Sequence, residues 1–96
     1  MSYDYCVFIK NFSGSQHDYE LSYTDGTTKT TKTIAVSNGD QGDEVLELEA
    51  TMVPFEVKVL PGGPHIDFTL AVNGAGMSAN VSHEKDNTLS ILIVNP

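Results

Sequence analysis

Residues 17–36, HDYELSYTDGTTKTTKTIAV, carry the clearest structural signal in the chain. From His17 to Thr24 apolar and polar side chains alternate, which predicts a strand with one buried face. Asp25-Gly26 then predicts a tight type I′ hairpin turn, in which two successive residues have positive φ. Thr27–Val36 should therefore return antiparallel beside the first strand. Its first half has threonines and lysines but no apolar residue, which predicts an edge strand.

The same alternation recurs along the rest of the chain, with turn-forming residues between the segments. The other predicted strands are residues 3–10, 44–52, 55–60, 65–72, 77–83 and 88–94, and Pro54 breaks the run between residues 52 and 55. No segment has helical periodicity. Eight short strands predict an all-β protein: a small antiparallel β-sandwich, immunoglobulin-like or jelly-roll-like, with no significant helix.

The chain has 96 residues, of which 40% are hydrophobic, so residues 1–96 should form a single domain with one core. Tyr3 with Tyr5 and Tyr19 with Tyr23 share strand faces, and we expect both pairs to pack between the sheets. The lone cysteine, Cys6, should behave as a small core residue. The last strand is apolar on both faces, which predicts a position in the middle of a sheet.

The charge of the chain excludes several kinds of partner. Thirteen acidic residues stand against five basic ones, giving a net charge of −8 and a pI of about 4.5. A nucleic-acid ligand is excluded, because its binding needs basic residues that neutralise phosphates. No apolar stretch is long enough to insert into a membrane, and no signal peptide precedes the first strand. We therefore expect a cytoplasmic protein, or one released without a signal peptide.

If every strand crosses the domain once, the loops separate into two groups at opposite ends. Residues 11–16, 37–43, 61–64 and 84–87 fall at one end, and residues 25–26, 53–54 and 73–76 at the other. The first end gathers most of the acidic loop residues together with two histidines. A binding site is expected there, because loops on a rigid scaffold carry function more often than the scaffold does.

Asn38, Asp40, Asp43, His65 and Phe12 are the candidate ligand-binding residues at this end. The amide and carboxylates can hydrogen-bond to sugar hydroxyls, and Phe12, in a polar loop, is the aromatic residue least explained by core packing. Flat aromatic faces beside hydrogen-bonding groups suit carbohydrate recognition. These features predict a small carbohydrate-binding protein, a lectin. Single sugar sites are weak, so avidity favours a homo-oligomer.

The loop Ser37–Glu44 also suggests a calcium site, with Asn38, Asp40, Asp43 and Glu44 as oxygen ligands. Its spacing departs from the twelve-residue calcium loop, and the same residues suit an ordinary solvated turn. No other cofactor is predicted.

No catalytic constellation is present, so we expect a protein that is not an enzyme. Glu47 and Glu49 alternate with leucines, as on a solvated strand, and a domain of this size leaves no room for a deep cleft. Two other functions remain open. One is a structural or self-assembling β-sandwich with protein partners, joined through strand edges. The other is a protease inhibitor that presents the Pro61–Pro64 loop.

Overall fold

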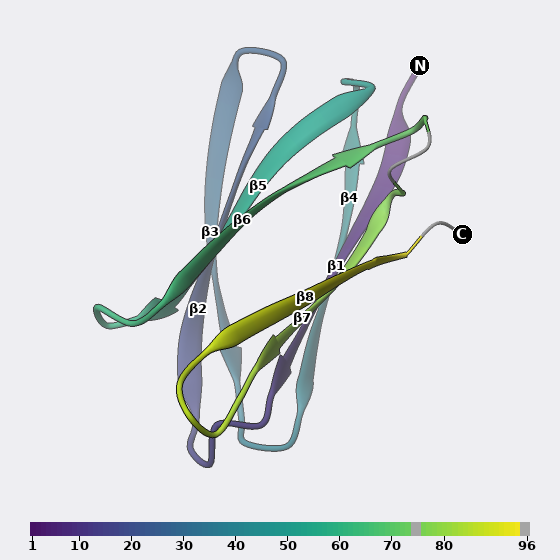
Figure 1. Cartoon of the computed structure of the whole chain (residues 1–96). Coiled ribbons are helices and arrows are strands. Elements are labelled where there is room, and N and C mark those ends of the chain that lie inside the picture. The colour runs from purple at the N-terminus through teal and green to yellow at the C-terminus, as the bar shows by residue number, and fades with distance from the viewer. Residues whose placement is uncertain (74–75, 95–96) are drawn as a thin grey trace.

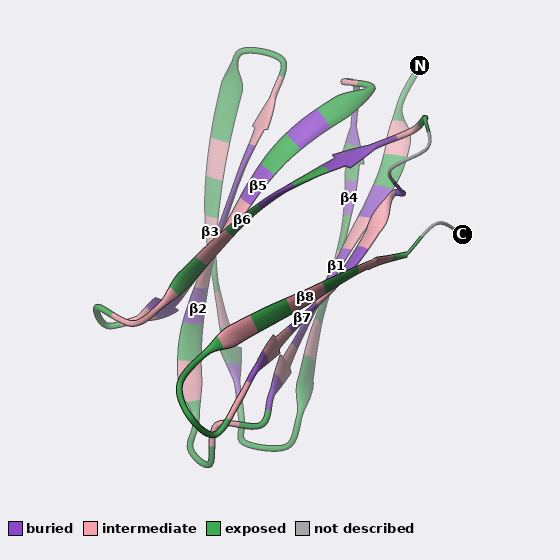
Figure 2. Ribbon diagram, viewed as in Figure 1, coloured by how far each residue is buried: buried purple, intermediate pink, exposed green. Residues whose placement is uncertain are grey.

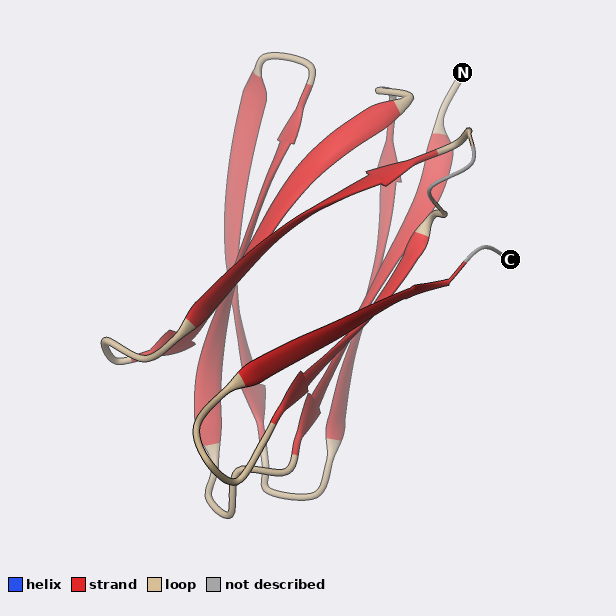
Figure 3. Cartoon of the chain, in the orientation of Figure 1, coloured by secondary structure: helices blue, strands red, loops and turns tan. Residues whose placement is uncertain are grey.

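The computed structural model describes residues 1–73 and 76–94, so the predicted turn at 73–76 is described only at its two ends. The described residues form eight strands and no helix (Figure 3), and so include no helix that could cross a membrane. The strands are β1 (Tyr3–Asn11), β2 (His17–Asp25), β3 (Thr28–Val36), β4 (Gln41–Leu48), β5 (Met52–Leu60), β6 (His65–Ala71), β7 (Ser78–His83) and β8 (Leu89–Val94).

Two four-stranded sheets face each other, which confirms the all-β sandwich (Figure 1). Sheet A has the strand order β4-β1-β7-β8, and sheet B has the order β3-β2-β5-β6. Neighbouring strands are antiparallel with one exception: β1 and β7 run parallel, from Cys6 beside Ser78 to Asn11 beside His83. Alternation could not predict this pair, because it shows which face a side chain occupies but not the direction of the neighbouring strand.

The core lies between the sheets, where most inward side chains of the central strands are buried (Figure 2). The predicted tyrosine packing is confirmed for Tyr5 and Tyr19, which are fully buried, and for Tyr23, which is 7% exposed, whereas Tyr3 is only partly buried against the core. Phe55 stacks on Phe68 with ring centroids 5.4 Å apart and contacts Tyr23 at 5.7 Å. Burial of these large apolar side chains is the main driving force for folding in a domain without disulfides.

The β2–β3 hairpin is confirmed, but its turn is centred one residue later than predicted. Asp25 pairs with Thr28, so Gly26 and Thr27 are the central residues, and of these only Gly26 has positive φ, at 64°. A type I′ turn needs positive φ at both central residues, so this turn, with positive φ only at its first central residue, is of another type. As a result Asp25 ends β2, and its carboxylate accepts hydrogen bonds from the N–H groups of Glu49 and Ala50.

Pro54 lies inside β5 instead of ending a strand. At this point β5 pairs with β6 alone, because its pairing with β2 stops at Phe55. A proline is tolerated there because one side of the strand has no ladder to interrupt.

Two expectations about sheet A are wrong. β8 is an edge strand, not a central one, although its side chains are apolar on both faces. Cys6 lies on the outer face, between Val45 and Ser78, and is only half-buried. On β1 the side chains of Tyr5 and Val7 point into the core. Cys6 lies between them in the strand, so its side chain points to the opposite face.

The grouping of the β1–β2 and β3–β4 loops at one end, beside the end of β7, is confirmed by hydrogen bonds. Asn11 N–H donates to the carbonyl of Asp40, and Phe12 N–H donates to the carbonyl of His83. Asn11 is fully buried, and its side-chain amide donates to the carbonyls of Ser15 and Val36 at 2.8 and 2.9 Å. This one side chain therefore ties the β1–β2 loop to the end of β3.

Candidate binding site

The outer face of sheet B is a continuous polar surface built from cross-strand rows. Its side chains alternate along each strand with the buried ones, so they point away from the core. The rows are Thr33, Glu20, Lys58 and His65; Thr31, Ser22, Glu56 and Asp67; and the pairs Lys29 with Thr24 and Pro54 with Thr69.

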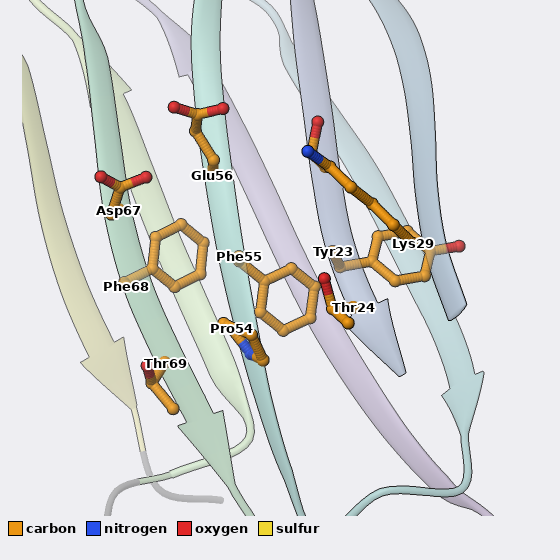
Figure 4. A pocket seen from close by; sticks show the side chains of 10 residues that line it. Tyr23, Thr24, Lys29, Pro54, Phe55, Glu56, Asp67, Phe68 and Thr69 are labelled. Carbon is orange, nitrogen blue, oxygen red and sulfur yellow. The ribbon is translucent and has the colours of Figure 1, made fainter. Parts of the chain in front are cut away.

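This face is hollowed, with a cavity volume of about 400 Å³. Figure 4 shows the carboxylates of Glu56 and Asp67 side by side at one end and Pro54 and Thr69 at the other. Lys29 lines the hollow from the β3 side. The remaining lining residues are Ser22, Tyr23, Thr24, Phe55 and Phe68. The hollow thus combines two anionic groups, one cationic group and several hydroxyls within a volume typical of small-molecule sites.

Glu56 and Asp67 stand directly opposite each other on β5 and β6. Like charges in this position destabilise a sheet unless a positive group compensates them. His65 is that group when protonated, because its Nδ1 lies 3.1 Å from Glu56 Oε2 and 3.9 Å from Asp67 Oδ2. The three residues also offer one imidazole nitrogen and two carboxylate oxygens, and these atoms all lie within 4.8 Å of one another. Divalent cations such as Zn²⁺ bind to ligands of these types. These three residues could therefore hold a metal ion.

The candidate residues in the loops, Phe12, Asn38 and Asp40, lie near the end of β1. Two of them, Asn38 and Asp40, are hydrogen-bonded to backbone groups of neighbouring segments. Asn38 Oδ1 accepts from the N–H of Gly14 at 2.9 Å. Phe12 is 48% exposed, as expected for a contact residue outside the core. Asp40 is exposed, and its carbonyl is held by Asn11 N–H. Phe12 and Asp40 therefore flank the end of β1 on an accessible surface.

The four residues of the calcium prediction do not converge. β4 begins at Gln41, so Asp43 and Glu44 are consecutive strand residues that point to opposite faces of sheet A. Asp43 faces outward, where its carboxylate accepts a hydrogen bond from Gln41, and Glu44 lies on the side of buried Leu46. A single ion therefore cannot contact both carboxylates, and among the residues that the structure describes the acidic members of this set do not form a group of converging ligand atoms.

His65 lies away from the loop-end candidates, beside the hollow. The residues missed by the sequence analysis are its neighbours there, Glu56 and Asp67, with Lys29 and Ser22. Their outward positions follow from alternation, so each was visible as a surface residue. Their convergence was not visible, because it depends on β6 pairing with β5 and β2 with both β3 and β5.

A second polar cluster, which is structural, runs from the core to the β7–β8 loop. His83, fully buried on β7, lies 2.8 Å from the Tyr19 hydroxyl through Nδ1 and 2.8 Å from Asn87 Oδ1 through Nε2. Because the oxygen of Asn87 only accepts, Nε2 donates to it, and Nδ1 accepts the hydroxyl proton of Tyr19. Desolvation of the Tyr19 hydroxyl raises its pKa to about 12. The cluster fixes the β7–β8 loop to the core, and of its three residues only Asn87, in that loop, is exposed.

Comparison of the chain with known proteins found no matching family model, no similar curated protein and no similar solved structure.

Proposed function

We propose that this protein is a non-enzymatic carbohydrate-binding module that holds its ligand in the hollow on the outer face of sheet B. The observation that carries the proposal is the lining of that hollow: two carboxylates, an ammonium group and several hydroxyls on neighbouring strands. Such groups can hydrogen-bond to adjacent hydroxyls of a sugar ring. The cavity of about 400 Å³ accommodates a monosaccharide or a short oligosaccharide.

Each side of the hollow has a separate role in this proposal. Glu56 and Asp67 accept hydrogen bonds from neighbouring sugar hydroxyls, and Lys29 donates to a ring or hydroxyl oxygen. Pro54 supplies an exposed apolar surface against the C–H face of the ring. Rigid strands hold these groups, so little conformational entropy is lost when the sugar binds.

A binding function suits this site better than hydrolysis of the sugar. Paired carboxylates catalyse glycoside hydrolysis when they flank the scissile bond within a cleft that excludes water. Asp67 is 70% exposed and lies on an open sheet surface. The ligand would therefore lie over the two carboxylates, and not between them.

The test is a glycan-array screen followed by calorimetric titration of the best ligand. Asp67→Asn and Glu56→Gln should each weaken binding by at least about tenfold, the loss of one or two charge-assisted hydrogen bonds. Asp40→Asn is the matched control, because it removes an exposed carboxylate at the loop end and leaves the hollow intact. Loss of binding in Asp40→Asn alone would move the site to the loop end. An array without binding would refute the carbohydrate proposal.

The titration is repeated with EDTA to establish how Glu56, His65 and Asp67 contribute to sugar binding. Unchanged binding indicates that the side chains contact the sugar directly. Binding lost in EDTA and restored by Zn²⁺ would show that Glu56, His65 and Asp67 act by holding a cation.

A further inference from the structure

The four edge strands of the sandwich differ in one property that bears on association with other proteins. A sheet edge presents unpaired N–H and C=O groups, and soluble proteins usually protect it with charged side chains. Three edges follow this rule: β3 has Lys29 and Lys32, β4 has three acidic residues, and β6 has Asp67. The fourth edge, β8, has the sequence LSILIV and no charged residue.

The side chains of β8 are also poorly covered. On the outer face Leu92 is 64% exposed and Val94 is 38% exposed. On the inner face Leu89, Ile91 and Ile93 pack only partly against the core. Among the described residues β8 has a strand partner on one side alone, β7, which itself has no Asp, Glu or Lys. The edge is therefore apolar, uncharged and open to backbone pairing.

We propose that β8 pairs antiparallel with β8 of a second copy across a two-fold axis, so that the protein is a homodimer. The two A sheets then form one continuous eight-stranded sheet. A two-fold antiparallel pairing keeps outer side chains on the outer side, so Leu92 meets outer-face residues of the other copy. Apolar residues that are half exposed in one copy cover each other in the pair.

A second copy fits this edge because β8 is complementary to itself: an antiparallel pair of two β8 strands places uncharged, mostly apolar side chains against each other and brings no like charges together. Each copy has a net charge of −8, so two copies repel each other over most of their surface. The β7–β8 side is the one part of sheet A without acidic strand residues, and it allows the closest approach at least electrostatic cost. A basic partner would be attracted to the acidic surfaces outside β7 and β8. The charged edges β3, β4 and β6 disfavour further strand addition, so assembly closes at the dimer.

The proposal is independent of carbohydrate binding, and its test uses the full chain. Sedimentation velocity over about a hundredfold range of concentration should show a dimer that dissociates on dilution. Leu92→Lys should shift the dissociation constant upward by at least about a hundredfold, because it places two charges at the paired edge. Val45→Lys is the matched control: Val45 is 62% exposed on β4, the other edge of the same sheet, and this variant should dimerise like the parent.

Amide hydrogen exchange measured at low and high concentration adds a readout that is specific to the backbone. Protection that increases with concentration should be confined to residues 89–94. Equal circular dichroism spectra for both lysine variants establish that each is folded, as expected for substitutions at exposed positions. A parent chain that stays monomeric throughout, or a dimer that Val45→Lys dissociates and Leu92→Lys does not, would overturn the proposal.

Discussion

Removing the hydroxyl of Tyr19 should destabilise the protein far more than removing the hydroxyl of Tyr23. Both tyrosines lie on β2, four residues apart, with their rings on the core face. The Tyr19 hydroxyl is 2.8 Å from Nδ1 of the fully buried His83. The Tyr23 hydroxyl makes no hydrogen bond with any described residue, and its side chain reaches the surface. The two Tyr→Phe changes therefore remove the same group from the same face of one strand, and only Tyr19→Phe removes a buried hydrogen bond.

The expected magnitude follows from what Tyr19→Phe leaves behind. The ring and its apolar burial remain, so no cavity forms. His83 Nδ1 loses its donor in a site that water does not reach, and an unsatisfied buried polar group costs about 1–3 kcal/mol. For a domain of this size that corresponds to a fall in Tm of about 4 °C or more. Tyr23→Phe should change the free energy of unfolding by less than about 0.5 kcal/mol.

Urea denaturation at neutral pH measures both variants under the same conditions. The midpoint should fall for Tyr19→Phe at an unchanged slope, which shows that the folded state was destabilised without a change in exposed surface. If the two variants differ by less than about 0.5 kcal/mol, the buried cluster does not contribute to stability and its assignment as structural is refuted.

Three further predictions concern the same scaffold. Since the pKa of Tyr19 is raised from 10.0 to about 12, the unfolded chain loses this proton first, and stability should fall between pH 10 and 12 by up to about 2–3 kcal/mol in urea titrations. Tyr19→Phe should remove that part of the pH dependence. Asn11→Ala should lower the free energy of unfolding, measured by thermal denaturation, by more than about 2 kcal/mol, because it leaves the carbonyl of Val36 without its donor. Amide hydrogen exchange that stays slow in residues 12–16 of the variant would contradict this. Gly63→Ala should cost about 1–3 kcal/mol, because its Cβ would lie 2.8 Å from the backbone oxygen of Val59, and an unchanged Tm would contradict the packing.

Local sequence signals predicted the strands and most of the core. The β2–β3 hairpin was readable because both strands and the turn lie within twenty residues, and each signal depends only on neighbouring positions. Non-local pairing was not readable. An apolar strand such as β8 looks the same whether it is covered by neighbours within the chain or exposed at an edge, so its position was predicted wrongly.

The candidate site was harder to predict for the same reason. Loop residues such as Asn38 were predicted to bind a ligand because they are polar. In the structure the Asn38 side chain accepts a hydrogen bond from Gly14 that holds two loops together. The hollow depends on Glu56 and Asp67, which are eleven positions apart and meet only through the β5–β6 register. Only His65 was identified from the sequence as a candidate and also lies beside the hollow.

The parallel pairing of β1 with β7 has a consequence for how the chain is made. β1 is synthesised before the other seven strands of the sandwich, but both of its neighbours in sheet A, β4 and β7, come later, and the second of them only after Met77. Until then Tyr5, Val7 and Ile9 have no complete sheet to join. The β2–β3 and β5–β6 hairpins can form earlier, since their strands are adjacent in the sequence. Sheet B is therefore expected to assemble before sheet A, with refolding in the slow range of proteins whose contacts are far apart in the chain.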